Sequence, residues 1–330
     1  MPSRLAFIFR TDVHAAEHSP ESWKGDYPAE ILSSLEQIGE LARTAKACAV
    51  LDGGDFFHVK APTQNSHRLV ARVALLHQVY PCPVYSIEGD HDVKHNNLET
   101  LADQPLGVLY NAGVFRHLRD ETFTVDGVTV RVVGVPYSPF RKLEDLQSIR
   151  KRGDEVLIAI VHALAGENPP AMVEEFFGEP VFRYEQLIVD GGPDIFCFGH
   201  WHQDQGIVNL RDRWFVNQGA VSRDALSREN LTRTPKVALI EVLEGGAIQI
   251  TEHPLKVAPA AEVFDVERKA RKDRESKNIE QYVERIRSSL SVSDQESIEG
   301  AISSLDFARE IHGLALQYLQ QVRHRKKTST

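Results

Sequence analysis

The segment YSIEGDHD, Tyr85–Asp92, joins a short apolar run that is typical of a strand to a dense group of charges. Three carboxylates and a histidine follow the run within five residues: Glu88, Asp90, His91 and Asp92. Carboxylates so close together repel one another, which costs free energy unless a positive partner neutralises them. A bound metal ion would do so. The segment therefore predicts a strand that ends at a metal site.

Four other apolar runs end in the same way. FIFRTDVH ends at Asp12 and His14, AVLDGGDFFH at Asp55 and His58, LIAIVHA holds His162, and IFCFGHWH ends at His200 and His202. A single His or Asp after a strand is more often a turn residue or a surface group. Five ends in ordered succession favour one polar site, because ligand pockets of α/β folds form at the carboxyl ends of strands. Two histidines two residues apart on a strand would also face the same side.

The alternation of apolar runs with helical periods predicts a layered α/β fold. Runs rich in β-branched residues recur up to about residue 200, and AEILSSLEQIGELARTA and SHRLVARVALLHQV between them have the helical period. Since several runs are apolar on both faces, we expect strands covered on both sides. Further strands follow residue 204, with Gly245 and Gly246 forming a hairpin turn.

Length and composition indicate an ordinary soluble protein with one large domain, or with a large domain and an appendage. The chain has 330 residues, 42% of them hydrophobic, so its core needs no disulfides. Its three cysteines, Cys48, Cys82 and Cys197, show no Cys-x-x-Cys spacing and are expected to be thiols in a reducing cytosol. The longest apolar run, VLIAIVHALAG, is too short to cross a bilayer. We therefore expect a cytoplasmic protein with no membrane association.

The electrostatic character of the chain changes near residue 266. Residues 266–330 hold 13 Lys or Arg against 10 Asp or Glu, a net charge of +3, and since the whole chain carries −9, residues 1–265 carry −12. Apolar residues recur at spacings of three and four from Ile279 to Val322, which predicts two amphipathic helices. The apolar face of these helices could cover a surface of a partner protein, or it could pack against residues 1–265 of the same chain. We interpret residues 1–265 as the catalytic domain and 266–330 as a C-terminal helical extension.

The ordered motifs DVH, GGD, GDHD, VHA and GHWH resemble those of the calcineurin-like metallophosphoesterase superfamily over roughly residues 5 to 255. Within it, GGDFFHVKAPTQ is similar to the SbcD-type DNA nucleases, bacterial and phage relatives of the meiotic-recombination nuclease. The resemblance implies a four-layer α/β sandwich, with two central mixed sheets flanked by helices. It also implies a hydrolase that cleaves phosphodiesters as an exonuclease or endonuclease.

Carried over to this chain, the resemblance implies a dinuclear centre. Asp12, His14 and His202 would bind one ion, Asp90, His162 and His200 the other, and Asp55 would bridge the two. Mixed imidazole and carboxylate ligands suit manganese, iron or zinc better than calcium, and the nuclease resemblance favours Mn²⁺, with Mg²⁺, Fe²⁺ and Zn²⁺ as alternatives. Two such ions would polarise the phosphodiester and activate a water for in-line attack.

Two histidines beside the ligands are the candidate catalytic residues. His91 would stabilise the pentacovalent phosphate or protonate the leaving oxygen, and its alternative is a structural hydrogen bond at a strand end. His58 would position the scissile phosphate, or it is a solvated loop histidine. We expect Asp92 to orient His91 and Glu88 to be a solvated surface group.

Asp90 departs from the family pattern, which has Asn at this place. With Asp12, Asp55 and Asp90 ionised and a hydroxide as the attacking group, four negative charges match two dications. We therefore expect Asp90 to tighten metal binding while lowering Lewis acidity.

The resemblance also implies partners. SbcD-type nucleases work with an ABC-type coiled-coil ATPase of the SbcC class, which they bind through C-terminal helices, and they form homodimers within that complex. The acidic body is a poor binder of DNA by itself, although basic clusters such as RHLR (116–119) and IRKR (149–152) could guide a backbone if they rim the site. A small-nucleotide phosphodiesterase or phosphatase and a scaffold without activity are the alternative functions.

Overall fold

The computed structural model describes residues 4–20, 22–58, 65–94, 97–268, 270–271 and 274. The chain divides into two compact units, Met1–Phe264 and Asp265–Thr330. The separate roles that the sequence suggests for residues 1–265 and 266–330 stay predictions. The two amphipathic helices expected between Ile279 and Val322 lie outside the described residues.

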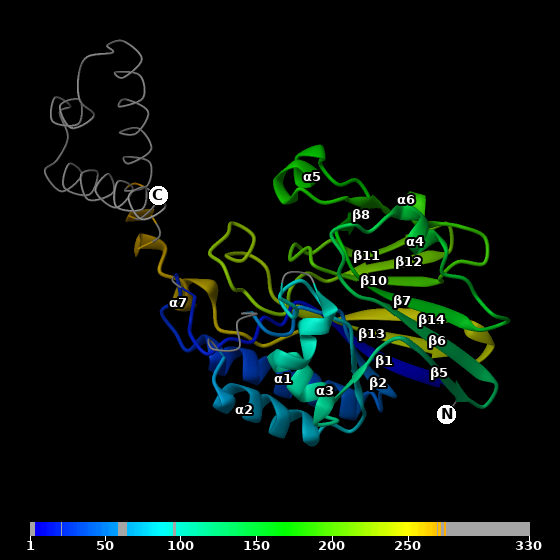
Figure 1. Cartoon of the computed structure of the whole chain (residues 1–330), viewed down its shortest axis with the longest axis horizontal. Coiled ribbons are helices and arrows are strands. Elements are labelled where there is room, and N and C mark those ends of the chain that lie inside the picture. The colour runs from blue at the N-terminus through cyan, green and yellow to red at the C-terminus, as the bar shows by residue number, and fades with distance from the viewer. Residues whose placement is uncertain are drawn as a thin grey trace, which may run out of the picture. The chain divides into compact units, whose positions relative to one another are not determined.

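Two six-stranded sheets form the centre of the first unit (Figure 1). The first sheet has the order β14-β13-β1-β2-β3-β4, in which β1 to β4 are parallel and β13 is antiparallel to both of its neighbours. Its strands are β1 Arg4–Arg10, β2 Ala49–Asp52, β3 Val84–Ser86, β4 Phe115–His117, β13 Lys236–Leu243 and β14 Ile248–Pro254.

The second sheet has the order β11-β12-β10-β7-β6-β5. The four inner strands are parallel, and β5 and β11 pair antiparallel at the two edges. Its strands are β5 Asp120–Val125, β6 Val128–Val135, β7 Val156–His162, β10 Ile195–Gly199, β11 Gly206–Leu210 and β12 Arg213–Asn217. Both sheets are therefore mixed, as expected.

Helices cover the outer face of each sheet, so the body has four layers (Figure 1). One apolar cluster lies between the first sheet and its helices, a second lies between the two sheets, and a third lies between the second sheet and its helices. The first sheet is covered by α1 Tyr27–Thr44, α2 His67–Gln78, the 3-10 helix η2 Leu98–Asp103 and α3 Pro105–Asn111, and the second by α4 Leu143–Gln147 and α6 Tyr184–Leu187. The predicted α/β sandwich is confirmed.

The capping of α1 shows how the sequence starts a helix below the first sheet. Asp26 precedes the helix, and its side chain accepts a hydrogen bond of 3.0 Å from Ala29 N, which satisfies one of the free N–H groups of the first turn. Pro28 occupies the first turn, where its missing N–H costs nothing. Ile31, Leu35, Ile38 and Ala42 recur at helical spacing and are buried against the sheet.

The inner strands β1, β2, β7 and β10 are buried along nearly their whole length, which explains their continuous apolar sequences. The run RLAFIFR coincides with β1 and KVALIEVL with β13. Gly245 and Gly246 both have positive φ, 79° and 82°, in the turn between β13 and β14, as the hairpin prediction requires.

Five short elements complete the described part of the chain. A two-stranded sheet of β8 Ala165–Gly166 and β9 Phe182–Arg183 carries α5 Ala171–Phe177 between its strands. The 3-10 helix η3 Glu244–Gly246 forms the turn before β14, and α7 Ala260–Val263 lies near the end of the first unit. None of the helices seen in the described residues has the length and apolar character required to cross a bilayer.

Candidate metal centre

The first group of candidate ligands lies where β1 and β2 end. Asp12 and His14 follow β1, Asp55 follows β2, and His202 follows β10. One potential ligand atom from each of these side chains lies within 4.8 Å of the others. His14 Nε2 is 2.9 Å from His202 Nε2 and 3.7 Å from Asp55 Oδ2. These four side chains therefore converge on one small volume.

The second group shares Asp55 with the first. Asp90 follows β3, His162 ends β7 and His200 follows β10, and their ligand atoms also lie within 4.8 Å of one another. Asp90 Oδ1 is 3.2 Å from His200 Nδ1 and 3.8 Å from His162 Nε2. All seven residues proposed from the sequence thus meet in two adjacent groups joined by Asp55. That they bind ions stays a prediction.

The backbone of four candidate ligands lies in the left-handed region. The φ angles are 51° at Asp12, 47° at His14, 54° at Asp55 and 87° at His200. Each such conformation costs a non-glycine residue on the order of 1–3 kcal/mol, and it persists only where the surroundings fix it. Backbone hydrogen bonds of 3.0 Å from Asp12 N to Gly54 O and from His14 N to Asp55 O tie the two loops together. Backbone strain of this kind clusters at functional sites.

Asp92 organises the loop that carries Asp55. Its carboxylate accepts hydrogen bonds from the backbone N–H groups of Asp55 at 2.8 Å, Gly89 at 3.0 Å and Phe56 at 3.2 Å. A Cβ atom on Gly89 would lie 2.0 Å from Asp55 Oδ1, so only glycine fits at this place. The expectation that Asp92 orients His91 was wrong, because its oxygens face these backbone donors.

The chemistry of the donors fits divalent cations. Asp55 Oδ2 and His162 Nε2 lie 3.5 Å apart and are buried, and neither atom has a hydrogen-bond partner within the described part of the chain. Burying such polar atoms without partners costs free energy. A cation bound between the carboxylates and imidazoles would satisfy both atoms, and this mixed donor set suits manganese, iron or zinc.

The protonation of the histidines reports the potential at the site. Burial lowers the pKa of His14 to about 3, and His202 acts in the same direction, so His14 is a neutral imidazole. Burial also opposes the charge of His202, but Asp224 and Asp12 outweigh it and raise the pKa of His202 to about 9. The carboxylates therefore produce a strongly negative potential that attracts either a proton or a metal cation, and the two compete for the same nitrogen.

Two further carboxylates contact the imidazoles of the GHWH segment. Glu179 Oε2 lies 3.1 Å from His200 Nε2, and Tyr137 donates its hydroxyl hydrogen to Glu179 Oε1. Asp224 Oδ1 lies 3.7 Å from His202 Nδ1. Such partners fix the orientation of a ligating imidazole. The sequence analysis missed both, because they lie on loops at no fixed spacing from the motifs.

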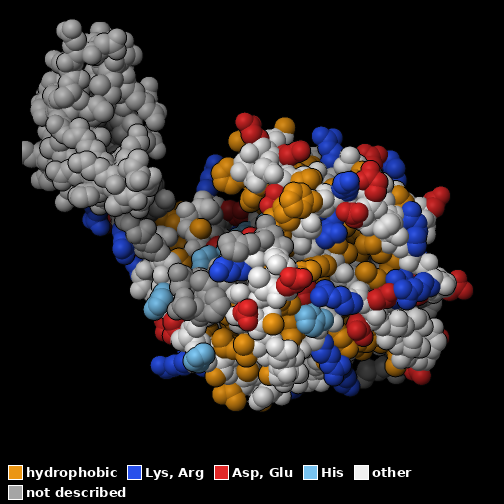
Figure 2. Space-filling model, viewed as in Figure 1, with side chains coloured by type: hydrophobic (Ala, Val, Ile, Leu, Met, Phe, Trp, Pro, Cys, Tyr) orange, Lys and Arg blue, Asp and Glu red, His pale blue; other side chains and the backbone are white. Residues whose placement is uncertain are grey.

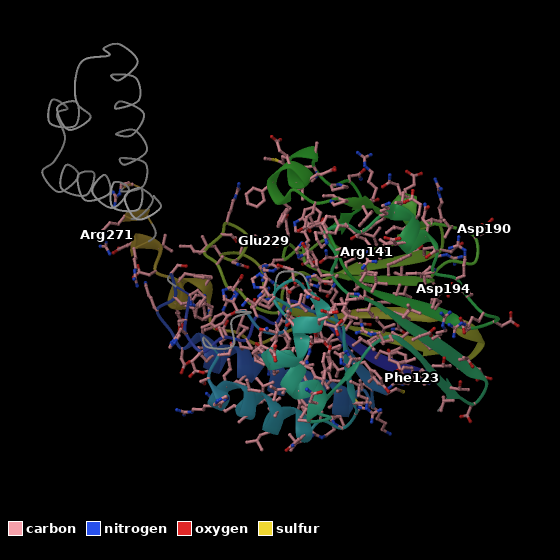
Figure 3. The ribbon with its side chains drawn as sticks, viewed as in Figure 1. Phe123, Arg141, Asp190, Asp194, Glu229 and Arg271 are labelled. Atoms are coloured by element: carbon pink, nitrogen blue, oxygen red, sulfur yellow. The ribbon has the colours of Figure 1, made fainter. Side chains whose placement is uncertain are left out.

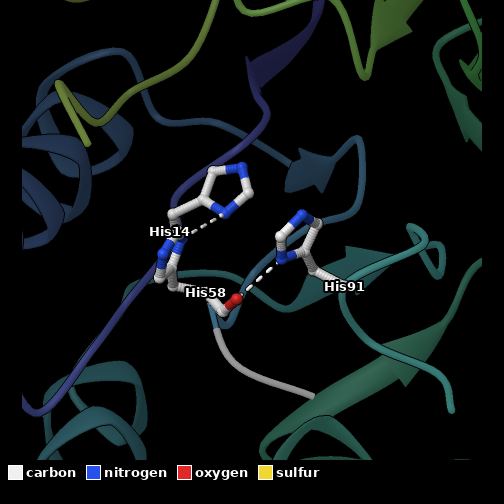
Figure 4. A group of neighbouring side chains, drawn as sticks. All are labelled: His14, His58 and His91. Atoms are coloured by element: carbon white, nitrogen blue, oxygen red, sulfur yellow. Dashed lines mark hydrogen bonds between the residues drawn. The ribbon is translucent and has the colours of Figure 1, made fainter. Parts of the chain in front are cut away.

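His58 and His91 lie together beside the first group (Figure 4). His91 Nδ1 is 2.6 Å from His58 O, and since a carbonyl only accepts, this nitrogen carries hydrogen and donates. Nε2 of His91 is then the atom available to a substrate. His58 Nδ1 is 3.3 Å from His14 Nδ1. His58 is therefore no isolated loop histidine, and the catalytic roles of both residues stay predictions.

Two further expectations from the sequence were wrong. His200 and His202 do not lie on a strand, since β10 ends at Gly199 and His200 is left-handed, so their side chains enter different ligand groups. Glu88 is fully buried instead of solvated, because its carboxylate pairs with His117 at 2.9 Å and Arg119 at 3.1 Å.

Three of the five Lys and Arg side chains in the clusters RHLR and IRKR are paired with acids. In RHLR, Arg119 pairs with Glu88, and in IRKR, Lys151 pairs with Asp194 at 2.6 Å and Arg152 with Asp120. IRKR precedes β7, whereas the candidate ligand His162 ends that strand. Figure 3 shows Asp194, the partner of Lys151, and Glu229 on opposite sides of the body. Glu229 lies on the connection between β12 and β13 that also carries Asp224, the partner of His202. Arg116 and Arg150 have no ion-pair partner among the described residues, so these two clusters offer only part of their charge to a phosphate backbone.

Comparison with known proteins agrees with this site. The sequence signature of the calcineurin-like phosphoesterases matches residues 5–204. The fold and the paired ligand groups define a metal-dependent phosphoesterase, which is a hydrolase. The chain belongs to the calcineurin-like phosphoesterase family.

Solved structures show similarity at low identity. The sulfate thiohydrolase SoxB of Thermus thermophilus, in complex with glycerol, is 12% identical with a TM-score of 0.45, and the match covers 76% of this chain and 56% of that chain. The protein TT1561, also of Thermus thermophilus, is 12% identical with a TM-score of 0.42, and the match covers 77% of this chain and 100% of that chain. No curated protein matches the chain.

Proposed function

We propose that this phosphoesterase is a DNA nuclease of the SbcD type, which uses two divalent ions, Mn²⁺ in the first instance, in DNA end processing, repair or recombination. The observation that carries the proposal is the position of His58. It belongs to the GGDFFH segment that is similar to the nucleases, and it lies against His14 with its carbonyl bonded to His91. The segment thus adds the imidazole of His58 beside the ligand groups, and its carbonyl holds the imidazole of His91 there.

The side chains have distinct tasks in this proposal. Asp12, His14 and His202 would hold one ion and Asp90, His162 and His200 the other, with Asp55 between them. When bound, the two ions polarise the phosphodiester and lower the pKa of the attacking water. The water oxygen bonds to phosphorus and the P–O3′ bond breaks, which leaves a 5′-phosphate. Protonated His91 then donates the hydrogen on Nε2 to the leaving oxygen, which leaves a 3′-hydroxyl.

A small-nucleotide phosphodiesterase is the second candidate. It is favoured by the ion pairs of Arg119, Lys151 and Arg152, because binding along a DNA backbone requires Lys and Arg that are available to several phosphates. A mononucleotide or a cyclic nucleotide places only one or two phosphates at the site and needs no such surface.

The two candidates are separated by substrate. Purified full-length chain would be incubated in Mn²⁺ with end-labelled single- and double-stranded DNA and, separately, with cyclic nucleotides. We expect DNA cleavage that chelation abolishes. His91→Ala serves as the matched control against a contaminating nuclease: it should keep both ions and lose about 10²- to 10⁴-fold in turnover. Hydrolysis of cyclic nucleotides with intact DNA would establish the second candidate instead.

Residues 266–330 are proposed to bind an SbcC-like ABC-type coiled-coil ATPase within a complex that contains two copies of this chain. The support is the basic charge and the amphipathic pattern of this segment in the sequence. It contains no motif of the metal centre, whose candidate ligands all lie in the first unit.

Removal of residues 266–330 tests this role. The shortened chain should keep its metal content and its Mn²⁺-dependent cleavage of short single-stranded DNA, and it should no longer co-purify with the ATPase. Charge reversal of Lys326 and Lys327 to Glu in the full chain is a milder companion variant. A shortened chain that is insoluble or free of metal would mean that the segment completes the catalytic domain.

A further inference from the structure

The loop between β8 and β9 presents aromatic side chains next to the metal centre. Its helix α5 buries none of its residues (Figure 1). Phe176 is 83% exposed and Met172 71%, while Phe177 is 40% exposed. Hydrophobic side chains gather on the surface in this part of the molecule (Figure 2). Exposed aromatic side chains held on a short helix cost free energy in water, and a ligand that covers them would recover it.

The aromatic side chains are continuous with the candidate ligands. The rings of Phe176 and Phe177 contact edge to face, with centroids 5.1 Å apart, and the ring of Phe177 lies 6.0 Å from that of His200. His200 in turn lies 5.0 Å from His162. The same loop supplies Glu179, which contacts His200 Nε2 and so fixes the base of the loop against the site. The wall formed by Phe176 and Phe177 therefore begins at the metal centre and leads outward.

The charge of the loop limits what can lie on this wall. Residues 167–179, ENPPAMVEEFFGE, contain four Glu and no Lys or Arg, and Glu174 and Glu175 are exposed beside the two rings. A phosphate backbone would be repelled along such a segment. An uncharged planar group attached to a phosphate in the metal centre would not be repelled. A nucleobase is such a group, and only one sugar separates it from its phosphate.

We propose that Phe176 and Phe177 stack with an unpaired nucleobase of the nucleotide whose phosphate occupies the metal centre. This inference rests on the proposed nuclease function and narrows its substrate to single-stranded or frayed DNA ends. Stacking on aromatic side chains tolerates every base, because each has a π-face. The wall would therefore select unpaired bases without selecting sequence.

The test compares oligonucleotides with and without a base. Wild type and Phe176→Ala/Phe177→Ala would be assayed in Mn²⁺ with a short single-stranded oligonucleotide and with its counterpart in which a tetrahydrofuran abasic sugar replaces the nucleotide at the cleavage position. We expect the double variant to raise KM for the normal oligonucleotide about 10-fold, in the range for loss of one base stack. KM for the abasic oligonucleotide should not change. Leu75→Ala, on α2 and also 64% exposed, is the control for removing an exposed apolar side chain.

A second readout does not depend on turnover. The fluorescence of 2-aminopurine at the same position should be quenched on binding to wild type and much less on binding to the double variant, with equal metal content in both proteins. Equal KM values of wild type for normal and abasic oligonucleotides would overturn the stacking wall while leaving the nuclease intact. Absence of all DNA cleavage by wild type would overturn the nuclease proposal and the wall with it. If the double variant no longer co-purifies with the ATPase and its KM for the normal oligonucleotide is unchanged, the two phenylalanines contact a protein partner. That result would overturn their role in binding a base.

Discussion

Two clusters of buried charge lie at the ends of β1 and β2, only a few residues apart, and they differ in how their charge is neutralised. In the first, Arg10 and Asp52 are both fully buried and Arg10 Nε donates to Asp52 Oδ2 at 2.6 Å. The guanidinium also lies over the ring of Phe56, 5.1 Å from its centre. The chain itself supplies the positive partner.

In the second cluster, Asp12 and Asp55 are equally buried, but their ion-pair partners among the described residues are histidines alone. A proton and a metal ion compete for the same nitrogen of a histidine, whereas arginine stays charged and binds no metal. The comparison teaches that burial of a carboxylate does not identify a metal site. The type of its ion-pair partner identifies the site. Only in the second cluster does neutralisation of the carboxylates depend on a cation from solution.

Asp55→Ala should have the largest effect on the second cluster, since it removes the carboxylate common to both ligand groups. We expect both ions to be lost and turnover to fall about 10³-fold or more, because a catalytic ion contributes several kcal/mol of transition-state stabilisation. His202→Ala, which affects only the first group, should lose less metal. Metal analysis of the purified variants checks this, and two full equivalents in Asp55→Ala would exclude Asp55 as the bridge.

Asp52→Asn should disturb the first cluster in a different way. The amide is neutral, and in either orientation its NH₂ faces a donor, the guanidinium of Arg10 or the N–H of Gly54. We therefore expect a loss of about 3–5 kcal/mol in the free energy of unfolding. Metal content of the folded fraction should not change. Urea unfolding with and without a chelator measures both effects. A chelator-dependent loss of stability in this variant would show that the two clusters are one electrostatic unit.

The first cluster should also show a pH dependence of its own. His77 Nε2 accepts from Arg10 at 3.0 Å, and its Nδ1–H donates to Val73 O at 2.8 Å. Burial and the charge of Arg10 hold the pKa of His77 well below 6.5, so only the unfolded chain binds a proton there as pH falls below that value.

Stability is therefore lost with falling pH, by up to about 1.4 kcal/mol per pH unit from this group. His77→Gln can make both hydrogen bonds without titrating. The unfolding free energy of this variant should depend less steeply on pH between about 6 and 5 than that of wild type. Identical slopes would place the titration elsewhere.

Asp90→Asn should have the smallest effect on activity, and it tests how the charge of the second cluster acts on a bound ion. It restores the family pattern and removes one negative charge from the group of His162 and His200. We expect Mn²⁺ affinity to fall about tenfold while the maximal rate rises a few-fold, because less donor charge reaches the ion. A titration of activity against Mn²⁺ separates the two terms. If neither changes, the charge of Asp90 has no influence on the reaction.

Much of the fold followed from the sequence because the inner strands are buried on both faces and read as continuous apolar runs. The strands β4, β5 and β11 were not anticipated. The edge strand β5 illustrates why: its other residues are polar or exposed, and Phe123 is its one half-buried apolar residue, so no apolar period marks it. Its Phe123 still packs on Phe7 between the sheets.

The candidate ligands were found because each ends or follows a strand, and parallel strands bring their carboxyl ends to one edge. Contacts between loops had no such signal. Glu179 and Asp224 reach His200 and His202 from connections whose paths depend on tertiary packing. Glu88 was misjudged for the same reason, since its partners His117 and Arg119 belong to the next strand and the turn beyond it.

The left-handed conformations of Asp12, His14, Asp55 and His200 bear on any effort to engineer this protein for heat resistance. Glycine adopts such φ angles without steric cost, so at each of these positions it would relieve local strain. A selection for higher melting temperature alone would therefore favour glycine at the four places where the side chain is needed. Thermostable variants of this chain should be sought away from the strand ends and screened for metal content in parallel, since activity and stability make opposite demands on the same φ angles.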